Sequence, residues 1–471
     1  MKKTKLPLLK TNRVIKKAEK SVVPKAEIGL KMDATFSLST LRSSIGADLM
    51  IQPSKAFNEV PTKDFNALFV KKCQDCCYLC DFTGDSDGKI KHIKTGLLRQ
   101  IINGLNMPQL MKSLQPASMK EFFCMLSTNL FRDFPSVSSI CPIDAHDCVF
   151  DSAWPHISII YETLTAFINS SLPQISLSSS FLYHLIGNSL SPDEREKAIV
   201  RDLLYLTYSK LVGCREIIRK NISYYFSSLL ASYELIEFYN SIVSGFSIPL
   251  KQDHISFYEK YFLALHSSPN FLSFHIPYVQ CLIKYISKSN SSIVPTVLFI
   301  SKHWPCSDKK KQLVFIAELS ELFVVFESLI SQDLAIPIFK QISMCTLSES
   351  QDVSASSFDF LMNPDILPIL TRYSHILYPI IMDPVTRAAK THWDECTQTN
   401  ALVTLQILSE IDQKAYSRAT EVYKNRKYSK CQSFKAFKDG WAAVFDAAKS
   451  ADRSITSINM DILRDRVLTK I

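Results

Sequence analysis

Scarcity of glycine constrains the fold of this chain more than any other feature of its sequence. Only 10 of the 471 residues are glycine, where a typical content of about 7% would supply roughly 33. Folds that depend on glycine turns, such as Rossmann sheets, β-propellers and P-loop enzymes, are therefore disfavoured. The composition favours helices joined by short turns, and a chain of this length forms either several domains or one elongated repeat array.

The positive charge of the chain is concentrated at one end. Residues 1–32 hold ten Lys/Arg and two Glu, which leaves 44 basic and 43 acidic residues in the remainder. The body is thus nearly neutral and offers no broad electrostatic footprint for nucleic acid. We expect residues 1–55 to form a basic, mostly disordered N-terminal tail, which could contact acidic partners, direct nuclear import or remain solvated.

From about Pro61 the sequence consists of helical segments separated by Pro, Ser and Asn. In 189–213, Ser191 and Glu194 fit a capping box with Pro192 at the first helical position, and apolar residues follow at helical spacing. Similar apolar helix pairs recur to about residue 450 without a strict period, and alternating strand patterns are few. The sequence therefore predicts an all-α protein, an α-solenoid of degenerate HEAT-like helical pairs over 56–450, followed by a C-terminal extension over 451–471. The Ser-rich stretch 346–357 is predicted to be a surface loop.

Catalytic signatures are missing from the sequence. It contains no G-x-G-x-x-G, Walker A, H-E-x-x-H or G-x-S-x-G motif. Asp85 and Asp87 resemble part of a calcium loop but lack the closing Glu, so a polar turn is expected. His156, His303 and His392 each lie near a Trp, and we expect them to be packed or hydrogen-bonded core residues. Neither an enzyme nor a cofactor is indicated.

Four cysteines, Cys73, Cys76, Cys77 and Cys80, form two overlapping C-x₂-C spacings, which can indicate zinc or redox chemistry. They also lie at i, i+3, i+4 and i+7, the spacing of one helix face. On a continuous helix Cys73 and Cys80 would be about 10 Å apart along the axis, too far for one tetrahedral zinc ion. We therefore predict a buried apolar face and no metal site, with zinc binding as the alternative.

No run of 18 uncharged apolar residues is present, so no membrane span is expected. The apolar stretch near the start is too short for a signal peptide. The sequence therefore predicts a soluble intracellular protein of the cytoplasm, with the nucleus as a second compartment, whose 13 cysteines are reduced thiols.

Six stretches of the sequence form a recognisable series: "LFVKKCQDCCYLCDF" (68–82), "AWPHISIIYE" (153–162), "LVGCREIIRKNI" (211–222), "SIVSGFSIPLKQDH" (241–254), "HWP" (303–305) and "AAKTHWDE" (388–395). In this order and spacing they resemble the B-prime family of regulatory subunits of protein phosphatase 2A. Each alone is weak, but six in order are specific, and the resemblance extends from about residue 60 to about 450. It implies a curved solenoid of HEAT-like pairs, in agreement with the periodicity.

The resemblance also implies a function without catalysis. Members of this family dock on the scaffold and catalytic subunits of the phosphatase and capture substrates or adaptors through a groove that receives a short Leu-x-x-Ile-x-Glu peptide. Such a groove requires two apolar pockets and a cationic patch. The positions that match the family's groove are Tyr208, Arg215, Arg219, Phe238, Ile242, Lys251 and His254. In this hypothesis Tyr208, Phe238 and Ile242 supply apolar walls, and the basic residues supply donors and positive charge.

The sequence also departs from the family's pattern around the groove. Tyr205 and Leu206 stand where the family typically has His then Arg, Asp202 stands in place of Thr, and Phe238 in place of Ile. These differences predict a less cationic groove, a weaker preference for phosphorylated peptides and a narrower aliphatic pocket, so the peptide motif is expected to have drifted. The alternative function is that of a generic helical-repeat adaptor or a transport receptor, which explains the solenoid but not the six ordered matches.

Overall fold

The computed structural model describes residues 51–82, 88–134, 150–170 and 177–451. This part of the chain consists of α-helices and short 3₁₀ or π turns, without a β-strand. None of its helices combines the length and apolarity needed to cross a membrane. The all-α prediction is therefore confirmed.

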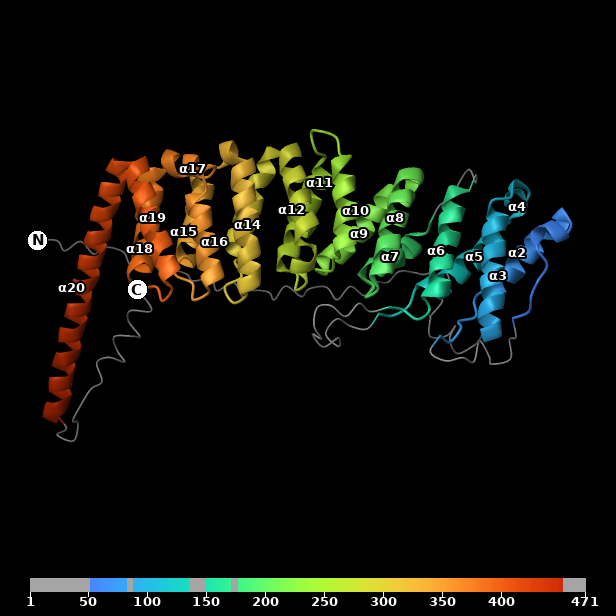
Figure 1. Cartoon of the computed structure of the whole chain (residues 1–471), viewed down its shortest axis with the longest axis horizontal. Coiled ribbons are helices and arrows are strands. Elements are labelled where there is room, and N and C mark those ends of the chain that lie inside the picture. Colours follow the sequence, from blue (N-terminus) through green and yellow to red (C-terminus); the bar gives the residue numbers. More distant parts are fainter. Residues whose placement is uncertain (1–50, 83–87, 135–149, 171–176, 452–471) are drawn as a thin grey trace, which may run out of the picture. The chain divides into compact units, whose positions relative to one another are not determined.

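The helices of the described residues follow one another along the chain (Figure 1). Those of the N-terminal half are α2 (Phe65–Asp75), α3 (Gly88–Leu105), α4 (Pro108–Ser113), α5 (Pro116–Leu130), α6 (Trp154–Asn169), α7 (Ser179–Gly187), α8 (Glu194–Lys210), α9 (Arg215–Ser227), α10 (Tyr233–Ser244) and α11 (Gln252–Phe257). Those of the C-terminal half are α12 (Phe271–Lys288), α13 (Ile293–Lys302), α14 (Lys309–Val325), α15 (Gln332–Cys345), α16 (Gln351–Met362), α17 (Leu367–Arg372), α18 (Ser374–Thr391), α19 (Glu395–Ile411) and α20 (Gln413–Ala451).

Packing between these helices is local in sequence. Contacts join α6 to α8, α8 to α10, α10 to α12, α12 to α14 and α14 to α16, and the most extensive are those of α10 with α12 and of α18 with α19 and α20. Each helix thus buries its apolar face against helices close to it in the chain, as expected for a solenoid. Figure 1 shows these helices side by side in chain order. The prediction of a helical-repeat architecture is confirmed.

Capping residues explain where several helices begin. The side chains of Asp193, Ser232, Asp308 and Asp394 each accept a hydrogen bond from a backbone N–H in the first turn of the following helix, and Pro116 occupies the first position of α5. The predicted start of α8 was wrong, because the N-cap residue is Asp193 and not Ser191. The Asp193 carboxylate accepts hydrogen bonds from the backbone N–H and from the guanidinium of Arg195. These bonds fix the start of the helix.

The cysteine-rich segment forms one helix face only over its first half. Phe69, Cys73 and Cys76 are buried, but α2 ends at Asp75, so the prediction of a continuous helix through residue 80 was wrong. Buried polar side chains terminate it: the Lys94 ammonium donates to the carbonyl of residue 78, 2.7 Å away, and the Asn129 amide donates to that of residue 76, 3.1 Å away. These carbonyls therefore bond to side chains of α3 and α5.

Burial also determines the protonation state of the cysteine thiols in this segment. It raises the pKa of Cys76 and of Cys77 to about 12, so both thiols are protonated at neutral pH. Among the described residues, no three His, Cys, Asp or Glu side chains are arranged to hold a metal ion. Burial of Phe69, Cys73 and Cys76 agrees with an apolar face over the first half of the segment.

Two other predictions are corrected in part. Within 346–357 only residues 347–350 form a half-buried or exposed connection, because Thr346 is buried and α16, which begins at Gln351, buries Val353 and Ser357. His156 and His392 are buried and hydrogen-bonded, as expected. His303 is exposed and stacks on a phenylalanine one turn earlier, so it is not a core residue.

Several predictions lie outside the described residues. They are the tail up to residue 50, the aspartates at 85 and 87, and the extension beyond residue 451. The division of the chain into tail, solenoid and extension stays a prediction.

Candidate functional site

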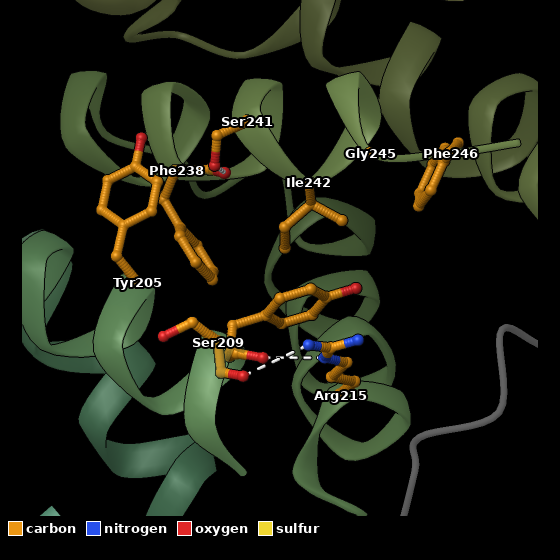
Figure 2. Close-up of a pocket in the computed structure, with 9 residues that line it drawn as sticks. Tyr205, Ser209, Arg215, Phe238, Ser241, Ile242, Gly245 and Phe246 are labelled. Carbon is orange, nitrogen blue, oxygen red and sulfur yellow. Dashed lines mark hydrogen bonds between the residues drawn. The ribbon is translucent and has the colours of Figure 1, made fainter. Parts of the chain in front are cut away.

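A cavity of about 340 Å³ lies beside α8, α9 and α10. Figure 2 shows the side chains around it. Its lining consists of Tyr205, Tyr208, Ser209, Arg215, Phe238, Ser241, Ile242, Gly245 and Phe246. The C-terminal halves of α8 and α10, together with the start of α9, therefore converge on one hollow.

Aromatic side chains form one wall of the cavity. Phe238 is fully buried in α10, and its ring meets Tyr205 edge-on at 5.3 Å between centroids and Tyr208 edge-on at 6.0 Å. Such edge-to-face pairs stabilise each other beyond their buried area. Ile242 lies one helical turn after Phe238 and is 5% exposed, so the wall continues along α10 as an apolar surface.

Arg215 supplies the cationic side of the cavity. Its Nε donates to the carbonyl of Tyr208 at 2.8 Å, and its Nη2 to the carbonyl of Ser209 at 3.3 Å. These carbonyls belong to the last turn of α8, where unpaired C=O groups attract a cation. The guanidinium carbon also lies 5.2 Å from the centre of the Tyr208 ring. Arg215 is thereby fixed in place while part of it faces the cavity (Figure 2).

Of the other three predicted residues, Arg219 and His254 contact side chains that line the cavity, and Lys251 does not line it. Arg219 donates from Nη1 to the Tyr208 hydroxyl at 2.9 Å. His254 stacks on Phe246, with 3.8 Å between centroids and 9° between planes. Burial, together with the charges of Arg219 and Lys251, lowers the pKa of His254. At neutral pH His254 therefore offers a ring surface and little positive charge, unlike the expectation. Lys251 is exposed at the start of α11.

The structure thus brings Tyr208, Arg215, Phe238 and Ile242 into one cavity. Arg219 is joined to that group by a hydrogen bond, and His254 through a stacked ring. Lys251 is not among the lining residues.

Sequence reasoning missed Ser209, Ser241, Gly245 and Phe246 as lining residues. It treated Tyr205 only as a departure from the family's pattern, although Tyr205 lines the cavity. The signal for Phe246 was its place in the sequence: it is an aromatic residue directly after Gly245, in the stretch 241–254 that also contains Ile242.

Near Tyr205 the net charge of the side chains is negative, whereas near Arg215 it is positive. Arg201 donates to Glu237 at 2.8 Å and pairs with Asp202 at 2.9 Å. The Tyr205 hydroxyl donates to the backbone carbonyl of Glu237 at 3.2 Å. One guanidinium therefore neutralises one of two carboxylates, and a net negative charge remains beside this end of the cavity.

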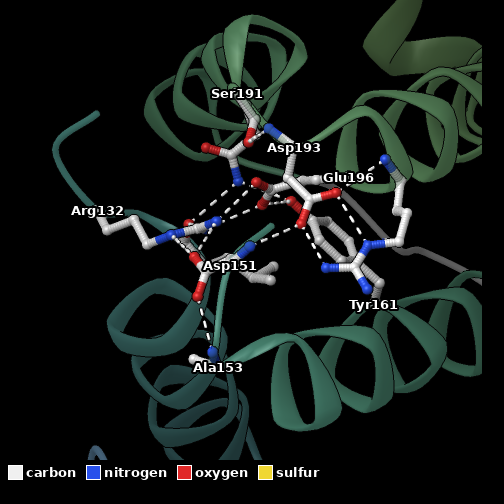
Figure 3. A network of polar contacts seen from close by, with 10 residues as sticks. Arg132, Asp151, Ala153, Tyr161, Ser191, Asp193 and Glu196 are labelled. Carbon is white, nitrogen blue, oxygen red and sulfur yellow. Dashed lines mark hydrogen bonds and ion pairs between the residues drawn. The ribbon is translucent and has the colours of Figure 1, made fainter. Parts of the chain in front are cut away.

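A second polar cluster at the other end of α8 is closed rather than open (Figure 3). Glu196 is fully buried and accepts two hydrogen bonds from Arg132, at 2.9 and 2.7 Å, and one from the Tyr161 hydroxyl at 2.8 Å. Asp151 pairs with the same arginine at 2.8 Å, and its backbone N–H donates to Asp193. These mutually satisfied groups join α5, α6 and α8 and leave no carboxylate for a ligand.

Fold and site together define a helical-repeat protein with a cavity beside α8, α9 and α10. Comparison with known sequences gives the class more closely: residues 54–448 match the family model "Protein phosphatase 2A regulatory B subunit (B56 family)". The chain belongs to this family, and it is a non-catalytic regulator rather than an enzyme.

Curated relatives agree with the family match along the chain. The rabbit 56 kDa regulatory subunit delta isoform of serine/threonine-protein phosphatase 2A is 26% identical over 431 residues, covering 87% of this chain and 73% of the relative. The mouse alpha isoform is 25% identical over 443 residues, 91% of each chain. A 59 kDa gamma isoform of the regulatory subunit from Arabidopsis thaliana is 26% identical over 377 residues, 76% of this chain and 72% of the relative. The similarity extends over almost the whole solenoid.

Proposed function

We propose that this chain is the targeting subunit of a protein phosphatase 2A holoenzyme. In this role it binds the scaffold and catalytic subunits and brings substrates or adaptors to the phosphatase. The proposal is supported by a family match that extends from residue 54 to residue 448 and by relatives named as regulatory subunits of that phosphatase.

We further propose that the cavity beside α8, α9 and α10 is part of the groove that captures the substrate. An extended peptide presents side chains at fixed intervals, and its specificity comes from pockets for some of these side chains. Phe238, Tyr208 and Ile242 offer apolar surface for aliphatic side chains. Arg215, with two of its N–H groups held by carbonyls, presents the remainder of the guanidinium to a carboxylate.

The observation that carries the groove proposal is the convergence of Tyr208, Arg215, Phe238 and Ile242 on one cavity. These residues come from the three consecutive helices α8, α9 and α10. A ligand with aliphatic side chains followed by a Glu fits this combination of apolar wall and fixed cation. The Leu-x-x-Ile-x-Glu type is therefore the starting motif.

Two experiments test the two parts of the proposal. Affinity purification of the full chain from its native cell should recover a phosphatase scaffold and a Ser/Thr phosphatase catalytic subunit. Recovery of neither at low salt would overturn the holoenzyme role. Calorimetric titration with a Leu-x-x-Ile-x-Glu peptide should give saturable binding that is lost when its Leu, Ile and Glu are replaced by Ala. Equal binding of the original and substituted peptides would overturn the groove.

A further inference from the structure

The charges around the cavity differ between its two ends. Tyr205 and the Phe238 ring lie at one end, and Arg215 and Phe246 lie toward the other (Figure 2). We infer that the groove is polarised, and that it selects segments with a basic or uncharged, unphosphorylated residue at the Tyr205 end and an acidic residue at the Arg215 end. This inference rests on the proposed function and specifies the class of segment captured.

The acidic end contains more carboxylates than cations. Asp202 lies one helical turn before Tyr205 on α8, and Glu237 directly precedes Phe238 on α10, so both flank the aromatic wall. Arg201 lies between them, and its Nε, Nη1 and Nη2 all donate to these two carboxylates. The Asp202 side chain is 67% exposed and that of Glu237 39% exposed. Their field therefore reaches a ligand, while the arginine between them is already engaged through all three of its nitrogens.

The hydroxyl at this end is also occupied. The single proton of the Tyr205 hydroxyl is donated to the Glu237 carbonyl, so binding a phosphate oxygen would break that bond. A phosphate brings a charge of about −1.5 to −2 at neutral pH. Next to a net negative cluster whose donors are engaged, it would be repelled, whereas a lysine or arginine would be attracted.

The opposite end has an excess of positive charge. Arg215 lines the cavity, Arg219 is one turn further along α9, and Lys251 is exposed at the start of α11. The nearby Asp253 is the acidic residue on the same short helix. Since the two ends carry opposite net charge, only one direction of a peptide with one basic end and one acidic end matches the groove. The polarity therefore sets both orientation and composition.

The probe is a set of three synthetic Leu-x-x-Ile-x-Glu peptides that differ only at the positions flanking the Leu, which carry Lys, Ser or phosphoserine. Titration into the full chain at low ionic strength should give affinities in the order Lys, Ser, phosphoserine. The Lys and phosphoserine peptides should differ by about tenfold, a magnitude expected for a few unit charges at partly solvated distances. Added salt should reduce the difference, because the charges are near the surface.

A matched pair of variants separates this local field from the charge of the whole protein. Asp202→Lys removes the excess carboxylate and should abolish or invert the order of the three peptides. Asp359→Lys makes the same charge change at an exposed position of α16 and should leave the order unchanged. Both positions are exposed, so neither variant is expected to unfold the protein.

The outcomes distinguish this inference from the function on which it rests. Equal affinities, tighter binding of the phosphoserine peptide, or an unchanged order in Asp202→Lys would overturn the polarised groove while the groove itself stands. If none of the three peptides binds, the groove assignment fails, and the inference fails with it.

Discussion

The two ends of helix α8 use charged side chains in opposite ways. At the N-terminal end, Glu196 is fully buried and holds hydrogen bonds from Arg132 and Tyr161. Toward the C-terminal end, Tyr205 and Tyr208 border an open cavity, and the charges near them are partly exposed. In the first cluster the polar groups are hydrogen-bonded to one another, whereas the second cluster has charged groups and apolar surface that are accessible to a ligand.

This difference distinguishes a group that stabilises the fold from one that can bind. A buried carboxylate that loses its partners is costly, because its charge stays in a low-dielectric interior. An exposed charge at a groove contributes little to folding but influences which ligand approaches. The closed cluster should therefore govern stability, and the open one should govern affinity.

The largest expected effect is on the closed cluster. Glu196→Ala would leave the Arg132 guanidinium without its bidentate partner and the Tyr161 hydroxyl without an acceptor. We expect a loss of about 3–5 kcal/mol in the free energy of unfolding, measured by urea denaturation. Glu216→Ala, at an exposed position of α9, is the control and should change stability by less than about 0.5 kcal/mol. Equal effects of the two would contradict the comparison.

A second effect concerns buried groups and pH. Burial, together with the charge of Lys94, lowers the pKa of His156 from its ordinary value of about 6.5 to about 4. Above pH 6.5 His156 is neutral in both the folded and unfolded states. Between pH 6.5 and pH 4 only the unfolded state gains the proton, so stability falls as the pH falls, by up to about 3 kcal/mol.

The test compares wild type with His156→Gln. Thermal or urea unfolding at several pH values should show a shallower loss of stability below pH 6.5 in the variant, because the glutamine cannot titrate. Exposed His303→Gln is the control and should keep the slope of the wild type. Parallel curves for wild type and His156→Gln would show that His156 does not carry this dependence.

The smallest effect is expected in the open cluster. Lys251→Glu should weaken an acidic Leu-x-x-Ile-x-Glu peptide by more than about 1 kcal/mol, or about fivefold, with no change in the free energy of unfolding. Lys310→Glu, exposed on α14, makes the same charge change away from the cavity and should leave the affinity unchanged. Unaltered affinity in Lys251→Glu would remove Lys251 from the groove.

Sequence reasoning went furthest where periodicity and composition decide the outcome. Few glycines and recurring apolar pairs predicted an all-α solenoid, because helices of this kind are stable only when their apolar faces meet. The groove positions came from the family resemblance, and not from spacing: nothing in the sequence alone brings Tyr208, Arg215 and Phe238 together.

The remaining features depend on contacts between distant residues. Asp193 caps α8 because Arg195 and the backbone at Asp151 hold its carboxylate. The α2 helix stops because Lys94 and Asn129 bond to carbonyls that follow it. Which side chain reaches which carbonyl is set by tertiary packing, so local pattern could not predict it.

The most direct test of the central claim is dephosphorylation by a reconstituted holoenzyme. Scaffold and catalytic subunits would be combined with the wild-type chain or with the Lys251→Glu or Lys310→Glu variant, and the substrate would carry the motif beside its phosphorylated site. We predict that all three chains assemble, and that wild type and Lys310→Glu accelerate dephosphorylation while Lys251→Glu loses most of the acceleration. Failure to assemble, or equal rates with all three chains, would contradict the account.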